Sequence, residues 1–383
     1  MTAHCVVRAP LIFAVMLAAP SLCASQASEH RSISVTFEND AFFGSSDSSY
    51  TNGIRVTWDL LRHVDWLRKA SRVTSFEWLA DAVNGARPIR ATRSACAPHE
   101  SREDGARNCM SVGFSLAQTM YTPSDIVDPV LQVNDRPYAG MLYGSLYVNT
   151  LRHRAQYSSE LQVGATGPAS GSEGTQSLAH WTWSTVSAKP RGWGNQLRTK
   201  PQVGLVNTYM YRPAFLEYCR TKFGCNGAYG ENRILDVTPR AETVLGTHMV
   251  RGSGGGMLRI GWRFPDAVGL TRIPTTVARS ADDGSGQFWF NGFVGFDGRA
   301  VLHNTFITGI SPFGNDRWNA ARQIALRRGV SELSYGGAAG FARGTVVVQV
   351  VERSAEYAPN GGSHRFGSVT LMLHTPKVAR GRR

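Results

Sequence analysis

The sequence predicts an all-β fold, a transmembrane antiparallel β-barrel of about twelve strands with a short helical insert. Many segments of about ten residues alternate apolar and polar side chains between turn signals, as barrel strands do. The chain is rich in glycine (40 residues) and in aromatic residues (17 Phe, 12 Tyr and 9 Trp). Beyond the N-terminus, no window approaches the roughly 18 to 20 apolar residues that a membrane-spanning helix needs. A helical membrane protein is therefore excluded.

The N-terminus predicts a secretory signal. Arg8 precedes an apolar run between Pro10 and Pro20, and small residues follow at Ser25 and Ala27. This order is typical of a cleaved leader. We therefore expect residues 1–27 to be a signal peptide and residues 28–383 to form a single barrel domain. A lipoprotein signal at Cys23 is an alternative, although the residues before this cysteine match such a signal poorly.

Four cysteines follow the predicted signal, and their spacing suggests two local disulfides. Cys96 lies close to Cys109, and Cys219 lies close to Cys225. An even number of cysteines in a secreted chain suits an oxidising compartment. Free or metal-bound thiols are the alternative, but the spacings match no familiar zinc motif.

The net charge of +13 predicts an anionic partner. A membrane surface of phosphorylated lipid fits an exported barrel, because Lys and Arg gain energy from the negative potential near the headgroups. Nucleic acid is not expected, since the chain shows no aromatic and basic binding module. Part of the charge can also be a general arginine excess in solvated loops.

The sequence contains thirteen candidate strands. Closed bacterial barrels have an even number of strands, so we expect one of the thirteen to be misassigned. They are residues 31–37, 54–60, 111–118, 140–150, 155–166, 201–212, 234–245, 256–264, 287–296, 301–310, 330–342, 345–354 and 365–374.

Polar ligand-type residues gather where the first two strands meet. Asn39 and Asp40 follow the first strand, and Thr51 opens the second. Neighbouring residues of a strand point to opposite faces, so Asn39 and Asp40 can serve one site only if the strand ends or bulges there. A polar hairpin stabilised by Asx turns is the alternative.

Residues 171–188 break the β pattern and predict a helix. Gln176 and His180 lie four residues apart and therefore share one helix face. Beside a polar wall, His180 can act as a base. The alternative is a structural histidine, since imidazole often serves that purpose.

Arg136 is a candidate phosphate ligand at the barrel rim. It follows Asp135 in a proline-containing turn that leads into the strand at residue 140. A guanidinium group matches phosphate oxygens bidentately. An Asp135–Arg136 ion pair that closes the turn is equally plausible from the sequence.

Six motifs occur in a fixed order: FENDAF, YTNG, YTP, NDRPYAG, GATGPASGSEGTQSLAH and GWGNQL. Together they resemble the outer-membrane lipid A 3′-O-deacylase (LpxR) family over residues 31–200. This resemblance implies a twelve-stranded barrel that lies in the bacterial outer membrane once the signal is removed. It also implies that the barrel acts on lipid A of lipopolysaccharide. It also implies a Ca²⁺-dependent site between the barrel wall and a short helix, and hydrolysis of the 3′-linked acyloxyacyl ester. A monomer is expected.

The resemblance also implies residue roles. His180 corresponds to the catalytic histidine, with Gln176 beside it, and Asn39 and Asp40 lie near the metal and the reacting carbonyl. Thr51, from the YTNG motif, is a further catalytic candidate. Asp40 is the expected metal ligand, and Arg136 the expected substrate contact. The sequence departs from the family pattern in its acidic residues. Residues 181–188 contain no acid, and basic residues instead of an acid follow GWGNQL.

The expected chemistry is ester hydrolysis by water. His180 would deprotonate the water, and Ca²⁺ would stabilise the oxyanion. Oxygen ligands suit calcium better than zinc. Two alternatives remain: an outer-membrane phospholipase with a Ser–His pair, and a pore or structural barrel without enzymatic activity.

Overall fold

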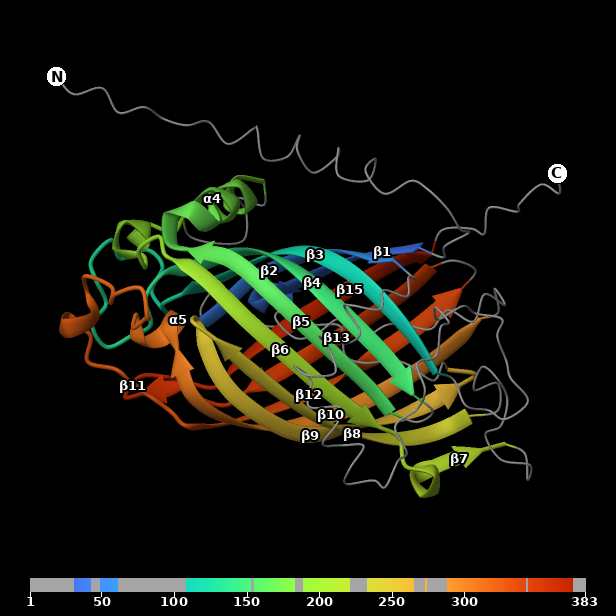
Figure 1. Ribbon diagram of the computed structural model, residues 1–383. Coiled ribbons are helices and arrows are strands. Elements are labelled where there is room, and N and C mark those ends of the chain that lie inside the picture. The colour runs from blue at the N-terminus through green and yellow to red at the C-terminus, as the bar shows by residue number, and fades with distance from the viewer. Residues whose placement is uncertain are drawn as a thin grey trace. The chain divides into compact units, whose positions relative to one another are not determined.

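In the computed structural model, twelve antiparallel strands form a closed barrel (Figure 1). The structure describes residues 31–42, 49–60, 108–152, 155–182, 189–220, 233–264, 273, 288–341 and 344–374. Neighbours around the barrel run β6, β5, β4, β3, β2, β1, β15, β13, β12, β10, β9 and β8, and pairing of β6 with β8 closes the ring. The predicted fold class is confirmed.

The barrel strands are β1 (Arg31–Asn39), β2 (Ser49–Leu60), β3 (Asn108–Thr122), β4 (Ala139–Arg152), β5 (Ala155–Thr166), β6 (Pro201–Tyr211), β8 (Arg233–Gly246), β9 (Met249–Trp262), β10 (Trp289–Asn304), β12 (Gly329–Phe341), β13 (Gly344–Arg353) and β15 (His364–His374). Three short strands lie outside this ring: β7 (Glu217–Cys219), β11 (Ala325–Leu326) and β14 (Tyr357–Ala358). The helices are η2 (Asp40–Phe42), η3 (Gly167–Ser170), α4 (Ser172–Thr182), η4 (Gly192–Asn195), η5 (Ala214–Leu216), α5 (Thr305–Thr308) and η6 (Asn319–Ala321).

The extra predicted strand results from one wrong division. Residues 287–296 and 301–310 were expected to be separate strands, but β10 runs from Trp289 to Asn304 without a break. The sequence Asp297-Gly298-Arg299 resembles a turn, yet its two charged side chains are satisfied within the barrel. Asp297 pairs with Arg240 at 2.7 Å, and Arg299 pairs with Glu332 at 2.6 Å.

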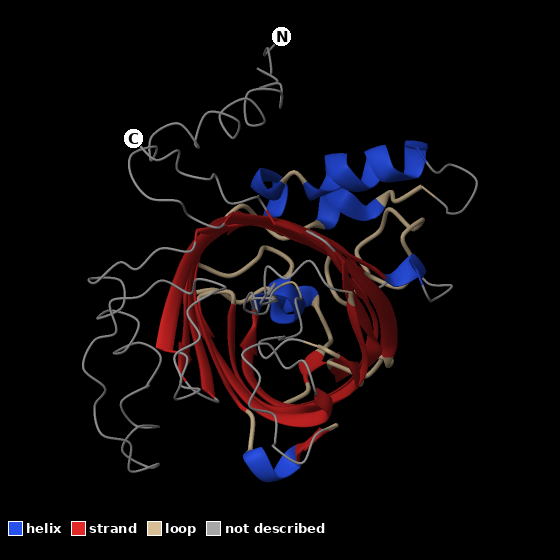
Figure 2. Ribbon diagram, turned by 90° about the vertical axis from the view of Figure 1, so that its right-hand side faces the viewer, coloured by secondary structure: helices blue, strands red, loops and turns tan. Residues whose placement is uncertain are grey.

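Side-chain polarity is the reverse of that in a soluble protein. Along β1, Ser34, Thr36 and Glu38 are buried, whereas Ile33 and Phe37 are about two-fifths exposed. This alternation places polar groups in the ring interior and apolar groups on its outer wall, as a lipid-embedded barrel requires. Figure 2 shows the ring along its axis.

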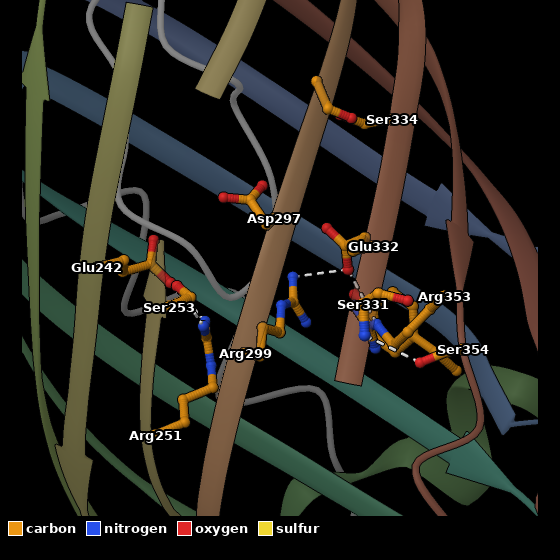
Figure 3. A network of polar contacts seen from close by, with 12 residues as sticks. Glu242, Arg251, Ser253, Asp297, Arg299, Ser331, Glu332, Ser334, Arg353 and Ser354 are labelled. Carbon is orange, nitrogen blue, oxygen red and sulfur yellow. Dashed lines mark hydrogen bonds and ion pairs between the residues drawn. The ribbon is translucent and has the colours of Figure 1, made fainter. Parts of the chain in front are cut away.

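Ion pairs cross-link the interior wall. Arg299 of β10 and Arg353 of β13 both contact Glu332 of β12, at 2.6 and 2.9 Å (Figure 3). On the opposite side, Arg55 of β2 pairs with Glu160 of β5 at 3.0 Å. Buried charges are tolerated when they are paired and hydrogen-bonded in this way.

An aromatic cluster fills one end of the barrel. Tyr50, Tyr121 and Phe366 converge from the wall, and Phe306 of α5 stacks on Tyr121 with ring centroids 4.7 Å apart. The carboxylate of Glu38 accepts hydrogen bonds from the Tyr50 hydroxyl at 2.7 Å and from the Ile273 backbone at 3.0 Å. The barrel wall, α5 and Ile273 therefore meet inside the ring.

This end of the barrel, called here the helix-bearing end, carries the β1–β2, β3–β4, β5–β6, β8–β9, β10–β12 and β13–β15 connections (Figure 1). β1 begins and β15 ends at the opposite end, because the strand number is even. None of the helices in the described part of the chain is both long and apolar enough to cross a bilayer.

Two predictions fall partly outside the described residues. Cys219 is disulfide-bonded, as its predicted pairing requires. Its expected partner Cys225 lies outside the described residues, as does Cys96. The predicted signal, residues 1–27, also lies outside them and stays a prediction.

Candidate active site on the outer wall

The first strand ends at the polar pair. β1 stops at Asn39, where it pairs with Asn52 of β2 and Gly367 of β15, and η2 begins at Asp40. The strand end that the sequence requires for these two residues is therefore present. By alternation Asn39 continues the outward series of Ile33 and Phe37. The Asp40 side chain is buried, with 1% exposure.

Thr51 occupies a β-bulge. Tyr50 pairs with Tyr121 of β3, but Asn52 pairs with Met120, so Thr51 is the additional residue. A bulge re-aims a side chain out of the regular alternation. The Thr51 hydroxyl lies 2.6 Å from the Thr122 hydroxyl of β3, and both side chains are buried. The bulge thus fixes the Thr51 hydroxyl at the edge of the outer wall.

Helix α4 lies against the outer wall (Figure 1), and Gly140 makes this close approach possible. A Cβ at Gly140 would lie 2.0 Å from the Ser172 Oγ and 2.5 Å from the Ser172 Cβ. The turn before the helix is fixed as well, because Gln118 of β3 donates a 2.7 Å hydrogen bond to the Ser170 carbonyl. Gly171 then adopts φ of +68°, which favours glycine.

Gln176 connects the helix to the wall. Its side chain is 2% exposed, and its Oε1 accepts a 2.8 Å hydrogen bond from the Trp193 indole N–H in η4. Trp193 packs in a cluster with Met120, Ile126 and Tyr138. Since Met120 pairs with Asn52, this cluster covers the outer wall next to the Thr51 bulge.

Residue 180 follows Gln176 by one helical turn on the same face of α4. The structure describes the helical backbone there, but the side chain of His180 lies outside its described part. The role of His180 therefore stays a prediction. Its helix is nevertheless held against the wall by Gly140 and Trp193.

Asn39, Thr51 and Gln176 thus lie along one outer face of β1 to β4. Arg136 does not join them. Its guanidinium is buried at the mouth of the ring, 3.4 Å from Glu356 and over the Tyr121 ring at 4.7 Å. The alternative ion pair between the side chains of Asp135 and Arg136 does not form. The Asp135 carboxylate instead accepts hydrogen bonds from the Tyr357 hydroxyl and from backbone N–H groups.

Arg136 helps to hold a buried carboxylate in its charged form. Burial raises the pKa of Glu356, but Arg353 and Arg136 outweigh that effect and lower it to about 2. A depressed carboxyl pKa stabilises the fold above the ordinary value near 4.5, and this stabilisation is lost as the pH falls toward 2. Arg136 therefore stabilises the mouth of the barrel.

The donors near Asp40 suit a hard cation in kind. Asp40 offers a buried carboxylate, Asn39 an amide oxygen and Thr51 a hydroxyl, all oxygen donors of the type that calcium prefers. Within the described residues, no three His, Cys, Asp or Glu side chains gather as a metal cluster. Among the described residues, the further ligands of a calcium ion at Asp40 would be amide, hydroxyl and backbone oxygens.

Two residues of this site had no role in the sequence interpretation. Gly140 and Trp193 stand in the motifs NDRPYAG and GWGNQL, but their contacts are with residues 32 and 17 positions away. No local periodicity indicates such contacts.

Replacing Trp193 with phenylalanine should loosen α4 without unfolding the barrel. The ring still fills the cluster with Met120 and Tyr138, but the hydrogen bond to the buried Gln176 Oε1 is lost. An unsatisfied buried acceptor costs about 1–3 kcal/mol. Hydrogen exchange of α4 should rise while that of the barrel strands stays unchanged; equal protection of α4 in both proteins would contradict the contact.

Comparisons with known proteins agree with the fold. The sequence model of the family described as Outer membrane protein LpxR matches residues 11–375. No curated protein sequence matches the chain. The solved structure of LpxR from Salmonella typhimurium has a TM-score of 0.63 at 15% identity, covering 89% of this chain and 99% of that one. An identity this low shows the fold alone.

Two other barrels are less similar. The β domain of the Bordetella autotransporter BrkA has a TM-score of 0.40 at 9% identity, covering 91% of this chain and 100% of that one. The transport unit of the autotransporter AIDA-I from Escherichia coli has a TM-score of 0.33 at 8% identity, with 93% and 92% covered. Neither carries an argument about function.

Proposed function

Since this chain belongs to the LpxR family of outer-membrane proteins, we propose that it is a lipid A deacylase that removes the 3′-linked acyloxyacyl group of lipopolysaccharide by ester hydrolysis. The observation that carries the proposal is the position of Gln176. It is buried between α4 and the outer wall, where it bonds to Trp193, and the Trp193 cluster covers the wall next to the Thr51 bulge. A site on the outer wall is open to lipid from the side.

The filled interior favours this proposal over a pore. The aromatic cluster of Tyr50, Tyr121, Phe306 and Phe366 occupies the helix-bearing end. Further along the ring, paired charges such as Arg55 with Glu160 line the wall. A water-filled channel needs a continuous open lumen, and these side chains reduce it.

His180 is the proposed general base. It takes a proton from water, whose oxygen attacks the ester carbonyl, and returns the proton to the sugar oxygen when the ester bond breaks. In this proposal the amide of Asn39 and the hydroxyl of Thr51 would donate hydrogen bonds to the developing oxyanion. The contact with Thr122 orients the Thr51 hydroxyl.

Calcium is the proposed cofactor, held by Asp40 and Asn39 together with other oxygen donors. When bound, it adds positive charge where the ester oxygen becomes negative. Helix α4 and the Trp193 cluster cover the wall at this place and limit the access of bulk water.

Chelation tests the proposal. Purified protein with lipid A and Ca²⁺ should release the acyloxyacyl product, and excess EGTA should lower the rate about 100-fold, because metal stabilisation of an oxyanion is worth several kcal/mol. Added Ca²⁺ should restore the rate. Deacylation that is undiminished in EGTA would remove the metal from the mechanism. Inactivation by a serine-directed fluorophosphonate would favour the phospholipase alternative.

A further inference from the structure

Two connections at the helix-bearing end carry a strong excess of positive charge. Residues 189–200 are the described part of the connection from α4 to β6, and residues 305–328 link β10 to β12. Together they contain one acid, Asp316, against eight basic residues: Lys189, Arg191, Arg198, Lys200, Arg317, Arg322, Arg327 and Arg328. We call Arg198, Lys200, Arg317 and Arg322 the rim cluster.

The two connections are joined by direct contacts. Arg317 donates a 3.1 Å hydrogen bond to the Gly194 carbonyl, and the Lys200 ammonium donates to the Gly314 carbonyl. Leu197 lies beside Gly309, where a Cβ would be 3.5 Å from its side chain. Figure 1 shows the β10–β12 connection beside the segment that follows α4. Lys200 and Arg317 therefore bridge the two connections.

Arg322 is the unusual member of the rim cluster. Its side chain is 2% exposed, and the nearest acid is Asp316, 3.5 Å from its Nη2. Its Nε, Nη1 and Nη2 have no hydrogen-bond partner among the described residues. A buried guanidinium with unused donors is costly, and an anion that accepts from it would remove that cost.

Asp316 carries one negative charge against the four cations of the rim cluster, so it does not neutralise them. Its carboxylate also accepts a 3.1 Å hydrogen bond from the Trp318 backbone. Burial lowers the pKa of Lys200, and Arg198 opposes the effect of Asp316 by lowering it further. The cations therefore repel one another, and a bound anion would relieve this repulsion.

The rim cluster is also close to the proposed site. Arg317 binds the carbonyl of Gly194, and the neighbouring Trp193 donates to Gln176. A ligand on Arg317 would thus be linked to α4 through Gly194 and Trp193 of η4. Arg136 lies at the mouth of the ring, paired with Glu356 at 3.4 Å and over the Tyr121 ring, and is not part of the rim cluster.

We propose that the rim cluster binds a phosphate group of lipid A and so positions the acyl ester at the outer wall. This inference rests on the proposed function. A guanidinium group can donate two parallel hydrogen bonds to the oxygens of one phosphate, which a lysine ammonium cannot do. The unused N–H groups of Arg322 are available for such bonds.

The test uses two exposed members, so that folding is preserved. The double variant Arg198→Gln/Arg317→Gln should raise KM for bisphosphorylated lipid A about fivefold for each arginine removed, since a basic residue near a lipid phosphate is worth about 1 kcal/mol. The kcat should not change. Dephosphorylated lipid A should show no difference between variant and intact protein. Arg220→Gln, an exposed arginine near the opposite end, is the matched control.

A binding measurement separates this inference from the proposed function. Bisphosphorylated lipid A should bind the His180→Ala protein more tightly than the same protein carrying Arg198→Gln/Arg317→Gln. If no deacylation occurs but this difference is found, the phosphate site stands and the proposed activity fails. If deacylation occurs but the double variant matches Arg220→Gln in KM and binding, the phosphate site is overturned.

Discussion

Replacing His180 with alanine is expected to lower kcat for lipid A deacylation by about 10²–10⁴-fold, the range that a general base contributes. The reason is positional. Residue 180 lies one turn from Gln176 on the face of α4 that meets the wall. KM should change little, because no substrate contact is removed. The measurement is single-turnover and steady-state kinetics with purified protein in Ca²⁺.

The matched control for this prediction is Leu178→Ala. Leu178 belongs to the same helix, but its side chain is 61% exposed and so lies away from the wall. Its loss should leave kcat within about twofold, as surface substitutions usually do. Equal rates for His180→Ala and Leu178→Ala would show that another group is the base.

Replacing Gly140 with alanine is expected to abolish most activity while leaving the barrel closed. The new Cβ would lie 2.5 Å from the Ser172 Cβ, so the start of α4 has to move away from β4. A displacement of about 1 Å at a catalytic group can cost 10²-fold in rate. The barrel should persist, because α4 lies outside the ring of strands. Deacylation rate and resistance of the folded barrel to heat in detergent check both parts.

Gly144→Ala provides the control on the same strand and face. A Cβ at Gly144 meets only the Ser115 carbonyl among its close neighbours, at 3.9 Å. Full activity of this variant alongside an inactive Gly140→Ala protein would locate the effect at the helix contact. Full activity of both would show that the position of α4 does not matter for catalysis.

Much of the barrel could be predicted from the sequence because lipid and lumen impose a strict alternation. Ile33 and Phe37 face outward while Ser34 and Thr36 face inward, and this pattern needs no knowledge of partners. The prediction failed where residues in the middle of a strand are of the types that usually form turns. Asp297 and Gly298 resemble a turn, and only their neighbours on β8, β9 and β12 show that the strand continues.

The candidate site was less accessible to sequence reasoning. The spacing of Gln176 and His180 requires only a helix, so it could be recognised locally. The contacts that hold that helix come from Gly140 and Trp193, which are distant in sequence. For Arg136 the side-chain chemistry could be recognised from the sequence, but its position in the fold could not. Its guanidinium suits phosphate, but the fold places it against Glu356, inside the mouth of the ring.

The proposed activity is removal of the 3′-linked acyloxyacyl group of lipid A by this outer-membrane barrel. It can be measured by mass spectrometry of lipid A from cells that produce the intact protein, with cells producing His180→Ala as the comparison. We expect a loss of mass equal to that group only with the intact protein. Unchanged lipid A in both, with folded protein present in the outer membrane, would contradict it.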